Sequence, residues 1–126
     1  MPAQFRSLLS LLTTPCPVRI SDVSRHYGIE VRCENIGTKR IVGLKLRANA
    51  LDSTLGFLRS IQAYSPKVNI APGYSDRLKW PLPNDAEENL LDNSDVRLEV
   101  WVDKALFDDG TTWSDRGSRS SRCLDL

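Results

Sequence analysis

The sequence predicts an all-β protein, an immunoglobulin-like antiparallel β-sandwich of about six to seven strands. Apolar and polar residues alternate over several stretches, which is the period of a strand with one buried face. Turn signals built on glycine, proline, asparagine and aspartate separate these stretches at fairly regular spacing. The chain has no long helical period and no internal repeat. Two packed sheets are therefore the expected arrangement.

The length of the chain, 126 residues, corresponds to one domain, and its composition suggests two flanking segments. We expect the sandwich domain to span residues 16–115. Residues 1–15 contain four leucines in a short apolar patch, and they are interpreted as a leader-like or flexible segment. A truncated leader and a short amphipathic helix both fit that patch. Residues 116–126 are rich in serine and arginine and are expected to form a solvated tail.

The first strand is expected over residues 17–24, with Val18 and Ile20 facing inward. Residues 28–51 predict a central hairpin, two long strands joined by a turn at residues 35–39. In its first strand Ile29, Val31 and Cys33 alternate with charged residues. The second strand places five residues on its apolar face: Val42, Leu44, Leu46, Ala48 and Ala50.

Turn chemistry defines the next part of the chain. Residues 52–56 form a turn cluster in which Gly56 is expected to adopt the left-handed conformation. Residues 57–65 predict a weak strand that runs into a loop. The Ala71-Pro72-Gly73 segment is typical of a type II turn. A strand follows it and ends at Pro81, at a sheet edge, because proline cannot donate to the ladder.

The last strong strand is predicted over residues 96–107, where four apolar residues alternate with charged residues and Trp101: Val96, Leu98, Val100 and Val102. Asp108-Asp109-Gly110 predicts a hairpin with a type I′ turn, after which the return strand starts at Thr111. We expect one common core, formed by Val31, Leu44, Leu46, Leu98 and Val100.

Composition and motifs argue against several classes of function. The chain carries 17 basic and 16 acidic residues, and this balance does not favour nucleic-acid binding. No apolar run approaches the roughly 20 residues of a membrane-spanning helix. The single histidine, His26, lies in no nucleophile or metal motif. We therefore assign no catalytic residue, no cofactor-binding residue and no metal ligand, and we expect no enzymatic activity.

Trp101, Arg97 and Glu99 form the candidate binding surface. If the alternating valines face inward, Trp101 faces outward among these charged residues. An outward aromatic ring can anchor a protein partner or stack on a sugar, unless the N-terminal segment or an arginine stem covers it. The preferred function is an accessory or protein-binding module that uses an exposed sheet face or edge. The alternative is a carbohydrate-binding sandwich. The oligomeric state stays open.

Three cysteines are present, and none belongs to a CxxC pair. Cys33 lies on the inward face of its strand and is expected to be a buried thiol. Cys16 and Cys123 flank the sandwich, and either a disulfide bond or two unrelated thiols fits their positions. A disulfide bond persists in an oxidising compartment, so a Cys16–Cys123 bridge predicts an extracytoplasmic protein, periplasmic or secreted.

Several segments carry recognisable strand and turn motifs. Residues 31–39 resemble a V-x-N-x-(S/G)-x-K pattern, with Cys33 at its first position, and residues 70–75 resemble an L-x-P-G-x-S pattern, with Ile70 in place of leucine. Residues 107–113 match an F-x-D-G-(S/T)-x-W pattern. Cys16-Pro17-Val18 and Ser121-Arg122-Cys123 are similar to segments that open and close such chains. Together these motifs resemble FxLYD-type immunoglobulin-like domains of small secreted bacterial proteins, although Leu51 stands where those domains have an aromatic residue. The resemblance implies an immunoglobulin-like sandwich with no known catalytic activity.

Overall fold

The chain forms eight strands in the part that the computed structural model describes, residues 15–25, 28–82, 90 and 93–115. This is more than the six or seven expected, because Lys67–Ile70 forms a short strand that the sequence did not predict. The first four are β1 (Val18–Ser24), β2 (Ile29–Asn35), β3 (Ile41–Leu51) and β4 (Phe57–Tyr64). The others are β5 (Lys67–Ile70), β6 (Ser75–Trp80), β7 (Arg97–Phe107) and β8 (Thr112–Ser114).

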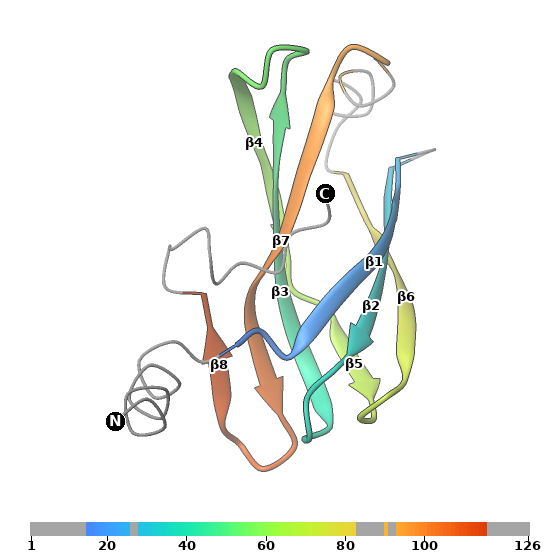
Figure 1. Ribbon diagram of the computed structural model, residues 1–126, viewed down its shortest axis with the longest axis vertical. Helices are drawn as coiled ribbons and strands as arrows, with labels where there is room; N and C mark the ends of the chain where they lie inside the picture. The colour runs from blue at the N-terminus through green and yellow to red at the C-terminus, as the bar shows by residue number, and fades with distance from the viewer. Residues whose placement is uncertain (1–14, 26–27, 83–89, 91–92, 116–126) are drawn as a thin grey trace, which may run out of the picture.

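Two antiparallel sheets pack face to face (Figure 1). The smaller sheet has the strand order β1-β2-β6. The larger has the order β4-β3-β7-β8, and β5 also pairs with β3. This division places the first, second and sixth strands opposite the third, seventh and eighth, as the A, B and E strands lie opposite C, F and G in immunoglobulin domains. The predicted immunoglobulin-like sandwich is confirmed.

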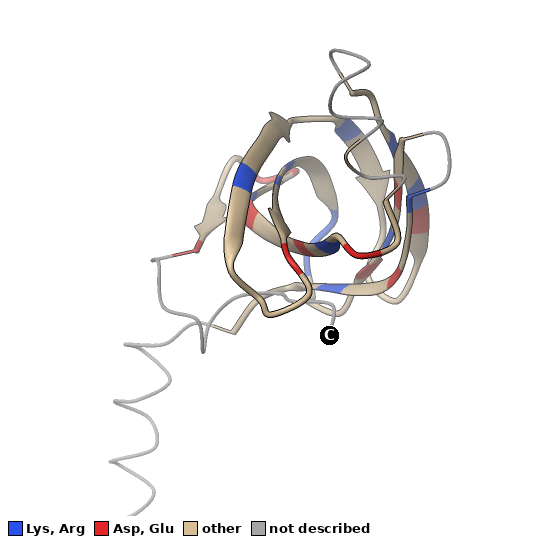
Figure 2. Cartoon of the chain, turned by 90° about the horizontal axis from the view of Figure 1, so that it is seen from above, with Lys and Arg blue, Asp and Glu red and all other residues tan. Residues whose placement is uncertain are grey.

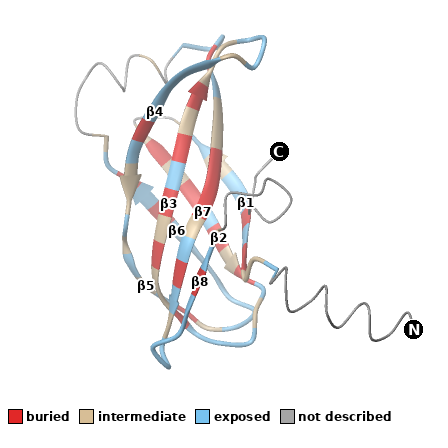
Figure 3. Cartoon of the chain, turned by 90° about the vertical axis from the view of Figure 1, so that its left-hand side faces the viewer, coloured by how far each residue is buried: buried red, intermediate tan, exposed pale blue. Residues whose placement is uncertain are grey.

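The core lies between the two sheets, as the buried residues in Figure 3 show. Four of the five expected core residues are buried, Val31 and Leu46 completely and Leu44 and Val100 almost completely. Leu98 is half-buried and packs against the edge of this core. The phase of β3 differs from expectation at its start, where a register shift between Ile41 and Gly43 buries Ile41 and leaves Val42 half-buried.

The expected central hairpin is wrong, because β2 and β3 belong to different sheets. β2 pairs with β1 and β6, whereas β3 pairs with β4, β5 and β7. The chain between them crosses from one sheet to the other, so the two apolar faces meet across the core instead of lying side by side. A hairpin and a crossover give the same alternating pattern, since both bury one face of each strand.

The buried side chain of Asn35 holds this crossover in place. Its Nδ2 donates to the backbone oxygens of Lys39 and Ile70, each at 2.8 Å, and its Oδ1 accepts from the backbone nitrogen of Gly37 at 3.0 Å. Asn35 is completely buried and is the polar residue in the core of the described chain. Its hydrogen bonds connect β2, the crossover and β5. They also take the place of hydrogen bonds to water for three backbone groups.

The turn between β7 and β8 is a hairpin, as predicted, but its type differs. The backbone nitrogen of Gly110 donates to Phe107 at 3.0 Å, and that of Phe107 donates to Thr111 at 2.9 Å. Gly110 has φ of 85°, while Asp109 does not have the positive φ that a type I′ turn requires. The turn is therefore a three-residue loop with one left-handed residue at Gly110. The type II turn at residues 71–74 is confirmed by a 3.0 Å hydrogen bond from Tyr74 to Ala71 and φ of 85° at Gly73.

Charged residues are interspersed around the strands, as Figure 2 shows from above. On the smaller sheet Arg19 pairs with Glu34, and Arg77 lies 2.9 Å from Glu30. On the larger sheet the Nε of Arg47 lies 3.1 Å from a carboxylate oxygen of Asp103. Each of these pairs joins residues of opposite charge on one sheet, so these six charges are balanced locally.

Candidate binding surface

The turn between β3 and β4 is fixed by the carboxylate of Asp52. Its Oδ1 accepts hydrogen bonds from the backbone nitrogens of Thr54 at 2.9 Å and Gly56 at 2.8 Å, and from the Thr54 hydroxyl at 2.7 Å. These donors favour the charged carboxylate, so the Thr54 hydroxyl first and the backbone groups after it lower the pKa of Asp52. The conformation of the turn is thus set before any ligand arrives.

Leu55 adopts the left-handed conformation in this turn, with φ of 67°. The β3–β4 turn and the β7–β8 turn have the same two backbone hydrogen bonds, since Leu55 donates to Asp52 as Gly110 donates to Phe107, and Asp52 donates to Gly56 as Phe107 donates to Thr111. The chain therefore places glycine at this position in one turn and leucine in the other. For a residue with a Cβ the left-handed conformation costs roughly 1–2 kcal/mol.

The expectation that Gly56 would be the left-handed residue is wrong, because Leu55 takes that role. Gly56 serves a different purpose. A Cβ at this position would lie 2.7 Å from the Oδ2 atom of Asp52, which is closer than real contacts allow. Glycine is therefore needed here so that the Asp52 carboxylate can approach the backbone.

Three apolar side chains are exposed at this turn and at the start of β4, and we call them the apolar tip: Leu55, Phe57 and Leu58. Their exposed fractions are 64%, 63% and 44%. Leu58 is the extra residue of a β-bulge, because Arg59 pairs with Ala50 and Phe57 pairs with Leu51, which leaves Leu58 without an opposite residue. Bulges redirect side chains in this way. Figure 3 shows this part of β4 as exposed.

Sequence reasoning missed the apolar tip. The signal available to it was the Leu-Gly-Phe-Leu run at residues 55–58, where three apolar residues around a turn do not follow the alternation of either flanking strand. Such a run at a turn has no core face to occupy and indicates exposed apolar surface.

A hollow of about 540 Å³ lies beside the apolar tip. Ser53 of the β3–β4 turn lines it, together with Arg25, Ser94, Asp95 and Arg97 and with apolar residues from β1 and β7. The guanidinium of Arg25 donates to the backbone oxygen of Val96, which joins the end of β1 to the approach to β7. Figure 1 shows the end of β1, the β3–β4 turn and the start of β7 at one end of the sandwich.

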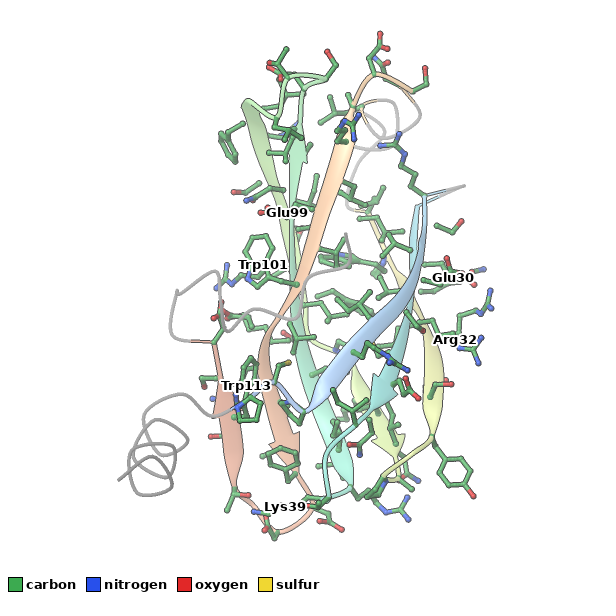
Figure 4. All side chains as sticks on the ribbon, viewed as in Figure 1. Glu30, Arg32, Lys39, Glu99, Trp101 and Trp113 are labelled. Carbon is green, nitrogen blue, oxygen red and sulfur yellow. The ribbon has the colours of Figure 1, made fainter. Side chains whose placement is uncertain are left out.

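The structure separates the residues expected to form one binding surface. Arg97 is exposed and lines the hollow, whereas Glu99 is half-buried and Trp101 is only 7% exposed. Glu99 and Trp101 project from the same side of β7 (Figure 4). Trp101 lies opposite Arg47 in the register of β3 and β7 and outside the core cluster, as its strand position predicts.

Of the two alternatives for Trp101, an open ring or a covered one, the structure shows the covered one. The position of a residue in a strand determines the side of the sheet it faces, but other parts of the chain determine whether that side is covered. With 7% exposed, the ring offers no open face on which a sugar could stack.

The cysteines are in different environments. Cys33 is a free, completely buried thiol, and burial, together with the negative charge of Asp76, raises its pKa to about 12. Cys16 is half-buried against the core just before β1. Cys123, its expected disulfide partner, lies outside the described residues, as do His26, residues 1–14 and the tail at 116–126.

In the described part of the chain, no three His, Cys, Asp or Glu residues are grouped so that they could hold a metal ion. The same residues include no helix with the length and apolar character needed to cross a membrane. No protein-family model and no curated protein matches this chain.

Proposed function

We propose that this chain is a non-enzymatic, extracytoplasmic protein-binding module, and that it contacts its partner through the apolar tip. The observation that carries the proposal is Leu55, which keeps a left-handed backbone although the equivalent turn of the same molecule uses glycine. Leu55 is 64% exposed, so core burial does not compensate for that backbone energy. Strained residues that persist without packing are found at functional sites, and exposed apolar clusters mark protein contacts.

A protein partner fits this surface better than a carbohydrate. The carbohydrate-binding alternative relied on Trp101, whose ring is 7% exposed. The apolar tip has a single aromatic ring, Phe57, and two aliphatic side chains. Apolar side chains that protrude from a rigid turn suit insertion into an apolar pocket of another protein, where burial of each contributes about 1.5–3 kcal/mol.

The extracytoplasmic location and the disulfide bond between Cys16 and Cys123 are parts of the same proposal. The FxLYD-type resemblance of the strand and turn motifs supports the location. Cys33 does not compete for either cysteine, because it is completely buried and its raised pKa keeps it protonated. Cys16 is the described cysteine that precedes the first strand, so a bridge from it would close almost the whole sandwich as one loop.

Thiol titration of the unfolded, unreduced full-length protein is expected to find one free cysteine, Cys33, and three after reduction. The physical reason is that only the pair Cys16 and Cys123 is oxidised in the proposed arrangement. A titration that finds three free thiols before reduction, on protein purified from its native host, would contradict both the bridge and the location.

Site-specific photocrosslinking from the apolar tip is expected to trap a partner protein. With benzoylphenylalanine in place of Phe57 in the full-length protein in its native host, we expect one discrete adduct. The matched control is Tyr74, which is 69% exposed and precedes β6 at the other end of the sandwich. We expect no adduct from that position. Equal labelling from both positions would show that the apolar tip is not a specific site.

Leu55→Gly sharpens this test, because it is expected to change stability and binding in opposite directions. Glycine removes the energetic cost of the left-handed conformation, although its greater flexibility in the unfolded chain offsets part of this gain. The free energy of unfolding should therefore rise by about 0.5 kcal/mol. The adduct from Phe57 should nevertheless weaken, since one apolar contact is lost. An unchanged adduct would contradict the role of Leu55.

A further inference from the structure

We propose that the partner segment bound at the apolar tip carries an aspartate or glutamate beside an apolar side chain, and that the carboxylate enters the hollow at Arg97. This inference rests on the proposed function and names the chemistry of its partner. The apolar tip and the hollow share one turn, because Ser53 lines the hollow and Leu55 is two residues further along. A partner segment that covers Leu55 can therefore also contact the hollow.

The charge of the hollow favours a single negative group. Its lining includes two guanidinium groups, Arg25 and Arg97, and one carboxylate, Asp95. Arg25 is already engaged with the backbone oxygen of Val96. Arg97 takes part in none of the ion pairs Arg19–Glu34, Lys39–Asp109, Arg47–Asp103 and Arg77–Glu30 that join described residues.

A carboxylate matches this arrangement better than a phosphate does. The lining has one more positive than negative charge, so a monoanion neutralises it, whereas a dianion would leave an excess negative charge. A guanidinium presents two parallel N–H groups that match the two oxygens of a carboxylate. The hydroxyls of Ser53 and Ser94 add donors at the same hollow.

The carboxylate is assigned to a side chain and not to the end of a partner chain. Sites for terminal carboxylates are typically made of consecutive backbone N–H groups. Here the donors of the hollow are side chains from three different segments, the end of β1, the β3–β4 turn and the start of β7. An extended segment can cross such an open hollow and continue on both sides.

A selection of linear heptapeptides from a random phage-displayed library, against the full-length protein, tests this inference. We expect the enriched peptides to contain Asp or Glu next to Leu, Ile or Phe. For the synthetic form of the leading peptide, Arg97→Glu is expected to weaken binding by about tenfold or more, since a charge-assisted contact becomes a repulsion. The matched control is Lys67→Glu, an exposed change of the same charge on β5, for which we expect unchanged binding. Arg97→Lys should bind the peptide more tightly than Arg97→Glu and more weakly than the wild type. It restores the positive charge but lacks the two parallel N–H groups of a guanidinium.

Each outcome of the selection decides between the two proposals. Peptides that are apolar or basic, bind at the apolar tip and are insensitive to Arg97→Glu would overturn the carboxylate inference and leave the protein-binding proposal intact. Peptides whose binding is unaffected by Leu55→Gly and by Phe57→Ser would overturn both. A library from which nothing is enriched would overturn the inference of a linear acidic segment and leave the protein-binding proposal to the photocrosslinking test. Thermal unfolding of each variant serves to verify its fold, and Arg97 is exposed, so its replacement should not disturb the core.

Discussion

Leu46→Ala is expected to lower the free energy of unfolding by about 2 to 5 kcal/mol. Leu46 lies in the middle of β3, the strand that pairs with β4, β5 and β7, and it is completely buried. Truncation to alanine removes three carbons from the core and leaves a cavity that the neighbouring strands cannot close, because β3 is held on both sides. Urea denaturation followed by fluorescence of the buried tryptophans measures this loss directly.

The control for this prediction is Leu106→Ala, in the neighbouring strand β7. Leu106 is 41% exposed, so the same chemical change should lower stability by less than about 1 kcal/mol. If the two variants are destabilised equally, Leu46 is not in the common core and the inward phase of β3 is wrong. A loss below about 0.5 kcal/mol for Leu46→Ala would lead to the same conclusion.

The inward faces of the strands could be predicted from the sequence because alternation is a local property. Val18 and Ile20 in β1 and Val100 and Val102 in β7 are buried as their alternation predicts. Strand pairing is not local. The strands at residues 29–35 and 41–51 bury one face in either a hairpin or a crossover, and the difference lies in contacts with β6 and β7, far along the chain.

The Leu-Gly-Phe-Leu run indicates exposed apolar surface, but the backbone conformation of the apolar tip could not be predicted, because two features there break local rules. Turn chemistry assigns the left-handed position to glycine by default, and Gly56 stood next to the residue that adopts it. The bulge at Leu58 depends on how β4 pairs with β3, which no pattern within residues 57–64 reveals. The strand pattern predicts that Arg97 belongs to the binding surface, but its position at the hollow depends on β1 and on the β3–β4 turn.

Asn35→Ala is expected to lower the free energy of unfolding by about 2 to 4 kcal/mol, although it removes no apolar contact area. The side chain makes three hydrogen bonds, and its loss leaves the backbone oxygen of Ile70 without that donor in a buried place. The matched control is Asn69→Ala. That neighbouring amide is exposed and accepts only from Arg40, at 2.7 Å, so its removal should change stability by less than about 0.5 kcal/mol.

Asn35→Asp separates the hydrogen-bonding role from packing, because the two side chains have nearly the same shape. An aspartate keeps the acceptor for Gly37 but places its other oxygen against the backbone oxygens of Lys39 and Ile70. Burial and these carbonyls disfavour the carboxylate, so the pKa of this aspartate is raised in the folded state above its unfolded value. A raised folded pKa means that the contribution is favourable below the unfolded pKa and is lost as pH rises through the folded one. Relative to the wild type, Asn35→Asp should therefore be more destabilised at pH 7 than at pH 4 in urea denaturation.

A difference in the free energy of unfolding between variant and wild type that is the same at both pH values would contradict this prediction. It would show that the side chain of residue 35 is not held against these carbonyls.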